Sequence, residues 1–329
     1  MTSAAPGNSV VCLRPRRDFD QVGVAVPEDL NVAYYDNERA LDRLGSDVAC
    51  LVLPSAGPAL APEMFDEASG LTLVQYTGAG IDRIADHVIE RLGCAVCNVP
   101  GASAPDVAAY VAVAAGVLLR KLSVGDRLMK EGRFDDARSL MVPAQVRGYR
   151  GLRVGVVGFG SIGFEVATTF RALGAEVLWY DPAPAAVDAS GLFERVELEE
   201  LLARCEVLTV HVPLMDATRS LIDAAALARL APGTVVINAA RGGIVDETAL
   251  MDALSSGHLG GVVLDVFTRE PLPGDSDLVA WAQRHSDRVL LSPHIAGVTP
   301  EASRVLFESA WSNVRAVLVQ GGEPRHRLR

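Results

Sequence analysis

Residues 153–163 read RVGVVGFGSIG, an apolar run that leads into a glycine-rich turn. The glycines follow the pattern GxGxxG: Gly158 permits a tight turn, Gly160 lets the backbone approach a pyrophosphate, and Gly163 allows helix and strand to pack closely. The pattern alone is common in glycine-rich chains. Here it directly follows an apolar run and directly precedes an amphipathic stretch, so the N-terminus of a helix would face the phosphates of a dinucleotide.

The same alternation of apolar runs and amphipathic stretches extends over most of the chain, which is typical of parallel sheets covered by helices. In the N-terminal third we expect five strands, at residues 10–13, 32–35, 48–53, 71–76 and 94–98. After residue 150 we expect six, at residues 153–157, 176–180, 207–212, 235–239, 262–266 and 289–291. The predicted fold class is α/β, with a Rossmann-type doubly wound parallel sheet and a smaller flavodoxin-like α/β unit.

Two long helical segments accompany these units. Residues 105–132 begin with Pro105 and carry Ala, Val and Leu over most of their surface, so we expect one long helix between domains or subunits. Residues 300–320 read as a helix with little strand material after it, which we expect to pack on the first unit. The polar, basic tail at 321–329 reads as a frayed end.

Length, composition and charge limit the function further. A chain of 329 residues, half of them hydrophobic, favours two globular units. A net charge of -11 disfavours binding to a phosphate backbone, so we expect no nucleic-acid partner. Residues 1–7 show no signal-peptide pattern, and the longest apolar stretch, 107–119, is shorter than the roughly 20 residues that span a bilayer. We therefore expect a cytoplasmic protein without a membrane segment.

The chain has five cysteines, an odd number that fits a reducing compartment better than a disulfide framework. Cys94 and Cys97 form a CxxC pattern, but no second pair and no nearby His complete a zinc site. We expect both to pack in a strand and expect no metal; a metal or redox role is the less favoured alternative.

Asp181 ends the strand after the glycine turn, at about the distance expected of the acid that binds the adenosine ribose. Its carboxylate would repel a 2′-phosphate, and no Arg or Lys follows at 182–184 to bind one. We therefore expect NAD rather than NADP. The alternative is an Asp that caps a helix or lies in a solvated turn.

Three later segments follow predicted strands, at the sheet edge where doubly wound folds bind ligands. They read NAARGG at 238–243, DVFTREP at 265–271 and SPHIAG at 292–297. Hydride transfer to a 2-keto acid needs a cation for the carboxylate, a proton donor for the developing alkoxide and a partner for that donor. The three segments contain one candidate for each role.

Arg241 suits the first role because its planar guanidinium matches a carboxylate. His294 can exchange a proton near neutral pH, and Glu270 would favour its charged form and fix its orientation. Asp265 could instead turn toward the nicotinamide carboxamide. The ordinary alternatives are a surface ion pair for Arg241, a loop carboxylate for Glu270 and a hydrogen-bonded loop histidine for His294.

The glycine turn and these three segments occur in the order found in D-isomer specific 2-hydroxyacid dehydrogenases, which the chain resembles over nearly its whole length. The resemblance implies that Arg241, Glu270 and His294 are the catalytic residues. It also implies a substrate domain formed by 1–101 and 298–329, an NAD-binding domain at 102–297, and a homodimer.

The motifs and the resemblance together predict the binding residues. The cofactor is expected to contact Gly158, Gly160, Ser161, Ile162, Gly163, Asp181, His211, Val212, Pro213, Ala239, Ala240, Asp265 and Gly297. The substrate is expected to contact Arg241 and His294, and the resemblance implies that the backbone at Gly78, Ala79 and Gly80 binds its carboxylate.

The chain also departs from the family pattern. Ser103 and Ala109 replace the usual Asn and Glu, so contacts made by those side chains must be missing or replaced. Pro54 stands where phosphoglycerate-specific members have an Arg, which makes a phosphorylated substrate less favoured. Arg83 is a candidate for an anionic substrate tail, although a solvated surface position is favoured.

The leading hypothesis is an NAD-dependent oxidoreductase that interconverts a small 2-keto acid and its D-2-hydroxy acid. One alternative is a dinucleotide-sensing interaction protein, similar to the corepressors built on this fold, because fold alone does not establish catalysis. Another is a reductase of an unusual phosphonate or sulfonate acid. The sequence does not identify the substrate side chain.

Overall fold

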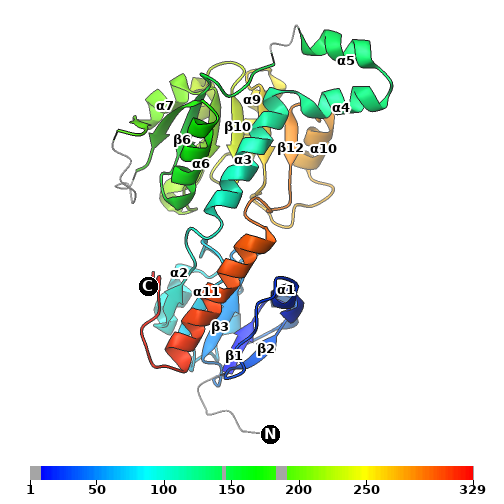
Figure 1. The fold of residues 1–329 in the computed structure, drawn as a ribbon. Coiled ribbons are helices and arrows are strands. Elements are labelled where there is room, and N and C mark those ends of the chain that lie inside the picture. Colours follow the sequence, from blue (N-terminus) through cyan, green and yellow to red (C-terminus); the bar gives the residue numbers. More distant parts are fainter. Residues whose placement is uncertain (1–8, 143–145, 183–190, 329) are drawn as a thin grey trace. The chain divides into compact units, whose positions relative to one another are not determined.

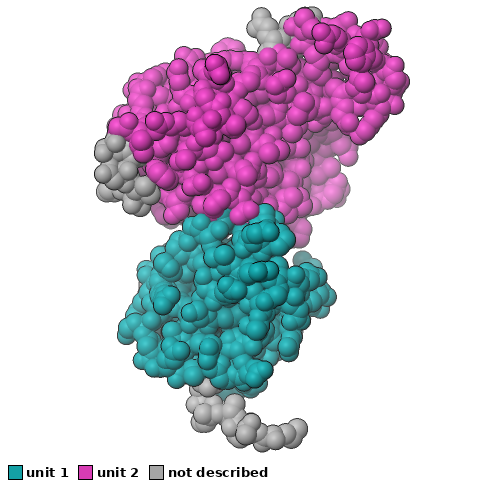
Figure 2. Space-filling model, viewed as in Figure 1, with its two compact units in different colours: residues 1–103, 298–329 teal, residues 104–297 magenta. Residues whose placement is uncertain are grey.

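A computed structural model describes residues 9–142, 146–182 and 191–328. The chain divides into two compact units, shown in different colours in Figure 2. Unit 1 comprises Met1–Ser103 and Val298–Arg329, and unit 2 comprises Ala104–Gly297. Residues 1–7, on which the expectation about a signal peptide rests, lie outside the described residues.

Unit 2 is built on a seven-stranded parallel sheet with the order β12-β11-β10-β9-β6-β7-β8 (Figure 1). The strands are β6 (Arg153–Val157), β7 (Glu176–Tyr180), β8 (Glu194–Arg195), β9 (Val207–Val210), β10 (Val235–Asn238), β11 (Gly261–Leu264) and β12 (Val289–Leu291). All six predicted strands are present. The additional strand β8 escapes sequence analysis because its two exposed, polar residues show no apolar pattern. The strand order reverses between β6 and β9, which is where doubly wound sheets bind ligands.

Helices cover both faces of this sheet because its strands are apolar on both sides. The first face packs against α3 (Ala104–Leu119) and α6 (Ser161–Ala172). The opposite face packs against α7 (Leu198–Arg204), α8 (Ala224–Arg229), α9 (Glu247–Ser255) and α10 (Asp277–Arg284). Because both faces of the sheet are covered by helices, we look for the functional residues in the loops beyond the strand ends.

The predicted single helix at 105–132 is wrong in its second half. After α3 the chain bends by 60° into α4 (Leu122–Lys130). Lys121 adopts a φ of 51°, a left-handed conformation that a continuous right-handed helix does not contain. The apolar surface of α3 packs against α6 and the sheet of its own unit, which explains its composition without a position between domains. A short helix, α5 (Phe134–Met141), then packs on α4.

Unit 1 contains a five-stranded parallel sheet with the order β2-β1-β3-β4-β5, the flavodoxin-like arrangement predicted. Its strands are β1 (Ser9–Cys12), β2 (Asn31–Tyr34), β3 (Cys50–Leu53), β4 (Leu73–Tyr76) and β5 (Ala95–Cys97), and its first helices are α1 (Arg16–Gln21) and α2 (Asp86–Leu92). The predicted C-terminal helix, α11 (Pro300–Leu318), packs on this unit as expected. Phe307 and Trp311 on α11 contact Phe19, with ring centroids 4.6 and 5.4 Å apart.

The C-terminal tail is not a frayed end, contrary to the sequence-based expectation. Arg327 forms an antiparallel bridge with Cys97, and the Leu328 N–H donates to the Val96 carbonyl at 2.9 Å. The tail therefore extends the edge of the unit 1 sheet at β5. Composition alone does not reveal this, because edge pairing uses backbone groups that every residue carries.

All five cysteines are buried and unpaired by disulfides. Cys94 and Cys97 lie in two hydrophobic cores of unit 1, and burial raises the pKa of both thiols. Within the described ranges no group of three or more His, Cys, Asp or Glu side chains could hold a metal ion. In the same ranges no single helix is long and apolar enough to cross a bilayer; only the bent pair α3 and α4 reaches that length and composition together.

Candidate active site

Arg241 lies in a turn after β10 that is shaped by Asn238. The Asn238 side chain accepts a hydrogen bond from the Ala240 N–H at 3.1 Å and donates one to the Arg241 carbonyl at 2.9 Å. Nη1 of Arg241 donates to the Ala240 carbonyl at 2.8 Å. Asn238 is 2% exposed, so it is a buried support of this turn, a role that sequence analysis did not assign.

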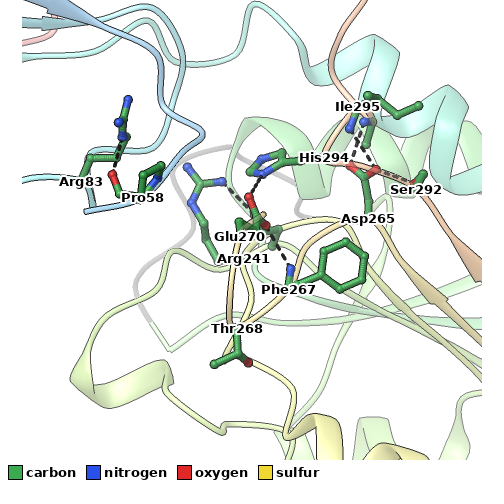
Figure 3. A network of polar contacts seen from close by, with 12 residues as sticks. Pro58, Arg83, Arg241, Asp265, Phe267, Thr268, Glu270, Ser292, His294 and Ile295 are labelled. Atoms are coloured by element: carbon green, nitrogen blue, oxygen red, sulfur yellow. Dashed lines mark hydrogen bonds and ion pairs between the residues drawn. The ribbon is translucent and has the colours of Figure 1, made fainter. Parts of the chain in front are cut away.

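Gly242 brings this turn against the loop that carries Glu270. A Cβ atom at Gly242 would collide with the backbone carbonyl of Phe267, so a side chain here would separate the two segments. The close approach places Arg241 beside the Glu270 loop, as Figure 3 shows. The structure thus brings the predicted cation and the predicted carboxylate together.

His294 follows β12, and its imidazole faces Glu270 (Figure 3). Nδ1 of His294 lies 2.8 Å from Oε2 of Glu270, and Oε1 accepts a hydrogen bond from the Phe267 N–H at 3.0 Å. A carboxylate only accepts hydrogen bonds, so Nδ1 carries a proton and Nε2 is left to exchange one with a bound molecule. Both side chains keep some exposure, 25% for His294 and 21% for Glu270.

The charges around Glu270 favour its ionised form. Burial by itself raises the pKa of this carboxyl group. The hydrogen bond and charge of His294, the Phe267 N–H and the charge of Arg241 outweigh burial and hold the pKa below its ordinary value. Glu270 is therefore a carboxylate at neutral pH, able to orient an imidazolium.

Asp265 lies directly after β11 and is fully buried. Its carboxylate accepts hydrogen bonds from Ser292 Oγ at 2.5 Å, the Ile295 N–H at 2.9 Å and the Ala296 N–H at 2.8 Å. The carboxylate thus holds the loop around His294. Its contact with a nicotinamide carboxamide stays a prediction.

The glycine turn has the shape that a dinucleotide requires. Gly158 adopts a φ of 95°, and a Cβ there would lie 2.6 Å from the His211 carbonyl carbon. A Cβ at Gly163 would collide with the Gly158 carbonyl, so α6 packs directly on the turn. At Gly160 an added Cβ would meet no atom within 4 Å, which leaves open space at the N-terminus of α6, where Ser161 and Ile162 begin the helix. These residues fit a bound pyrophosphate.

Asp181 lies at this turn, because Oδ2 accepts a hydrogen bond from the Phe159 N–H at 2.6 Å. A nearby cation escaped sequence analysis: Nη2 of Arg195, on β8, lies 3.5 Å from the Asp181 carbonyl oxygen. Its guanidinium lies over the Trp179 ring, 5.2 Å from the centroid. Residues 183 and 184, which follow Asp181 and Pro182, lie outside the described residues.

His211 directly follows β9, beside the glycine turn. Its Nε2 lies 2.8 Å from Thr209 Oγ1, and burial lowers its pKa to about 3, so the ring is neutral. Contacts to the cofactor stay predictions for His211 and for the other strand-end residues Val212, Pro213, Ala239, Ala240 and Gly297.

Residues 78–80 belong to unit 1, in the loop after β4. The Gly78 carbonyl accepts a hydrogen bond from the Val99 N–H at 3.0 Å, and the Ala79 carbonyl accepts one from Asn98 Nδ2 at 2.6 Å. Among the hydrogen bonds between described residues, none uses the N–H groups of Gly78, Ala79 or Gly80. This segment can therefore offer backbone donors to an anion.

Arg83 does not lie at a solvated surface position, contrary to the favoured expectation. It is 2% exposed, and it forms a 2.9 Å ion pair with Glu38. Nε donates to the Pro58 carbonyl at 2.9 Å and Nη1 to the Pro54 carbonyl at 3.2 Å. Arg83 thus holds the loop at 54–58 in place.

A family model described as "D-isomer specific 2-hydroxyacid dehydrogenase, NAD binding domain" matches residues 113–296 of the chain. This range contains the glycine turn and the segments that carry Arg241, Glu270 and His294.

Relatives of known description agree with this match. The chain is 34% identical over 307 residues to the (S)-sulfolactate dehydrogenase of Chromohalobacter salexigens, covering 91% of this chain and 96% of that protein. It is 35% identical over 241 residues to the D-3-phosphoglycerate dehydrogenase of Archaeoglobus fulgidus, covering 73% of this chain but 44% of that longer protein. The crystal structure of Rhodotorula graminis D-mandelate dehydrogenase superimposes with a TM-score of 0.82 at 26% identity, covering 98% of both chains.

Proposed function

Because the chain belongs to the D-isomer specific 2-hydroxyacid dehydrogenase family, we propose that it interconverts a small 2-keto acid and the matching 2-hydroxy acid with NAD as cofactor. The observation that carries this proposal is the His294–Glu270 pair at 2.8 Å in the loops beside Arg241. It supplies a proton donor with a fixed orientation next to a cation that can bind a carboxylate.

In the reducing direction, the NADH that the glycine turn would bind would supply a hydride for C2 of the keto acid. Arg241 holds the substrate carboxylate with its planar guanidinium. His294 donates the proton on Nε2 to the oxygen at C2, while the Glu270 carboxylate balances the imidazolium charge and keeps the ring in place. In the oxidising direction, neutral His294 accepts the proton of the hydroxyl group.

We assign the two parts of the chain different tasks in this reaction. Residues 102–297 bind the cofactor, through the glycine turn and Asp181. Residues 1–101 and 298–329 form the substrate domain, in which the backbone N–H groups at 78–80 bind the substrate carboxylate. The hydrogen bonds that fix the Gly78 and Ala79 carbonyls support this assignment.

The proposal is tested by following NADH oxidation with glyoxylate, hydroxypyruvate, pyruvate, bulkier 2-keto acids and phosphonopyruvate. Sulfopyruvate joins the panel because a relative that matches over nearly its whole length is a sulfolactate dehydrogenase. Turnover of any keto acid in the panel supports the dehydrogenase function, and the relative rates show which substrate the site prefers. NADH binding without turnover across the panel would overturn it in favour of a dinucleotide sensor.

NADPH is run in parallel as a test of cofactor choice. The Asp181 carboxylate at the glycine turn would repel a 2′-phosphate, so we expect a lower KM for NADH. Equal use of both cofactors would show that Asp181 does not determine the choice between NAD and NADP. Arg195 would then be the next candidate for a contact with the 2′-phosphate.

We also propose a homodimer formed through the helical hairpin of α4 and α5. This hairpin exposes large apolar side chains, Leu122, Met129, Phe134 and Leu140, and the first three of them line a groove of about 540 Å³. An exposed apolar surface of this kind is more often an interface than a solvated face. Sedimentation should give twice the chain mass, and Met129→Lys should shift the protein toward monomer. Met215→Lys, at an equally exposed methionine outside the hairpin, is the matched control.

We place the enzyme in the cytoplasm, with a small acid as its substrate and no nucleic-acid partner. Five cysteines without disulfides and a net charge of -11 support this assignment. Fractionation of cells that produce the protein tests the location.

A further inference from the structure

The backbone that carries His294 is held in an uncommon conformation. His294 adopts a φ of 56°, in the left-handed region that is unfavourable for a non-glycine residue. Its N–H donates to the Asp265 carbonyl at 2.7 Å and is also 3.1 Å from the Ser292 carbonyl. Such a conformation persists only where neighbouring contacts enforce it.

Those contacts converge on the Asp265 carboxylate. It receives hydrogen bonds from both sides of His294: from Ser292 Oγ before it and from the Ile295 and Ala296 N–H groups after it. Asp265 is fully buried, so these bonds do not compete with water. The position of the imidazole therefore depends on how firmly Ser292 and Asp265 are held.

A residue from another element completes this network. The Tyr110 hydroxyl, on α3, is hydrogen-bonded to Ser292 Oγ. Serine has a single hydroxyl proton, and Ser292 donates it to Asp265; the Tyr110 hydroxyl is therefore the donor in its own bond to Ser292. Burial raises the pKa of Tyr110, which keeps the phenol protonated as this donor role requires.

We propose that Tyr110 is a positioning residue for His294, acting through the Ser292 hydroxyl and the Asp265 carboxylate. The proposal rests on the dehydrogenase function proposed above. Tyr110 connects α3, packed in the core of unit 2, to the loop after β12, so it couples the proton donor to the rigid part of the unit. It follows Ala109 directly, at the segment where the chain departs from the family pattern.

Tyr110→Phe is the first test, because it removes the hydroxyl and keeps the ring. Tyr149→Phe is the matched control: Tyr149 is also half-buried and its hydroxyl also bonds to α3, at the Ala112 carbonyl, but it has no bond to the Ser292–Asp265 network. We expect Tyr110→Phe to lower kcat about 10-fold with the KM for NADH unchanged, because a misplaced proton donor costs turnover rather than cofactor binding. Tyr149→Phe should leave kcat within about twofold of wild type.

A conservative substitution at Ser292 distinguishes a positioning role of its hydroxyl from a general effect on protein stability. Ser292→Thr retains the hydroxyl and should keep kcat within about threefold of wild type, whereas Ser292→Ala should resemble Tyr110→Phe. A double variant Tyr110→Phe/Ser292→Ala should be no worse than Ser292→Ala alone, because both changes break one chain of bonds. If the two substitutions instead lower kcat by factors that multiply in the double variant, Tyr110 does not act through Ser292.

Amide hydrogen exchange gives a readout that needs no substrate. Faster exchange of the Ile295 and Ala296 N–H groups in Tyr110→Phe than in Tyr149→Phe is the expected result. Equal exchange together with equal kcat would overturn the proposal. If wild type turns over no keto acid, the proposed function fails while the exchange comparison still decides whether Tyr110 orders this loop.

Discussion

Nδ1 of His294 lies 2.8 Å from Oε2 of Glu270, and the second Glu270 oxygen is bound to the Phe267 N–H at 3.0 Å. Glu270 therefore does not rotate freely with the imidazole; the backbone of its own loop fixes the carboxylate, and the carboxylate fixes the ring. Folding lowers the pKa of Glu270, because its carboxylate is stabilised by these contacts. The stabilisation from the ionised carboxylate is therefore fully present above pH 4.5, the ordinary pKa, and is lost as the pH falls through the lowered pKa.

Glu270→Gln should slow keto-acid reduction. A neutral amide cannot balance the positive charge that His294 carries as a proton donor. We expect kcat/KM to fall about 10- to 100-fold. Glu247→Gln is the control, since Glu247 accepts a hydrogen bond from the Thr268 N–H in the same loop without contacting His294. An unchanged kcat/KM in Glu270→Gln would contradict the assigned role.

His294→Asn should abolish most turnover while leaving cofactor binding nearly unchanged. Asparagine tolerates the left-handed conformation of this position, so the loop should keep its shape while the proton donor is lost. We expect kcat to fall about 10²- to 10⁴-fold. NADH binding, measured by fluorescence, serves as the internal control; a parallel loss of binding would mean that the substitution disrupts the cleft.

Arg241→Lys should chiefly raise the KM for the keto acid. A lysine ammonium is a point charge and cannot form the two parallel hydrogen bonds that a guanidinium gives a carboxylate. Charge-assisted bonds of this kind contribute about 1.5–3 kcal/mol, which corresponds to about a 10- to 100-fold higher KM. The KM for NADH should not change, and an unaltered keto-acid KM would remove Arg241 from the substrate site.

Sequence patterns predicted the two sheets well because apolar runs identify buried parallel strands directly. They failed where local backbone geometry decides the outcome. The apolar pattern of residues 105–132 continues across Lys121, but a single left-handed residue ends the first helix there. The tail pairs with β5 through backbone groups that leave no mark on composition.

The candidate site shows the same division. Arg241, Glu270 and His294 could be found because each follows a strand and has the chemistry that the reaction needs. Asn238 and Tyr110, which support them, are an ordinary polar and an ordinary aromatic residue in the sequence. Tyr110 is 182 residues from its partner Ser292, so only the fold reveals the contact.

His211→Asn should change how stability depends on pH. Burial lowers the pKa of His211 from 6.5 to about 3. Between these values the unfolded protein binds a proton at His211 and the folded protein does not. The free energy of unfolding is therefore unaffected by His211 above pH 6.5 and decreases as the pH falls toward 3. Removing this titration should reduce the slope of the unfolding free energy in that window by up to about 1.4 kcal/mol per pH unit. Denaturant unfolding without NADH measures it. At a pH well above 6.5, where His211 is neutral in both the folded and the unfolded protein, the variant and the wild type should have equal slopes.

Asn313→Ala should destabilise unit 1, because Asn313 joins the sheet to the C-terminal tail. Its Nδ2 donates to Gln75 Oε1 at 2.6 Å and to the Arg325 carbonyl at 3.0 Å, and its Oδ1 accepts from the Arg325 N–H at 2.6 Å. Gln75 is fully buried, so truncation leaves its oxygen without a donor at a cost of about 1–3 kcal/mol.

The matched control for Asn313→Ala is Ser312→Ala, an exposed position next to it on α11. Surface changes of this kind usually alter stability by about 0.5 kcal/mol or less, so the two variants should differ clearly in denaturant unfolding. Faster amide exchange at Leu328, whose N–H binds the Val96 carbonyl, should accompany the loss in Asn313→Ala. If both variants unfold alike and Leu328 exchanges at the wild-type rate, the tail is held by its pairing with β5 alone.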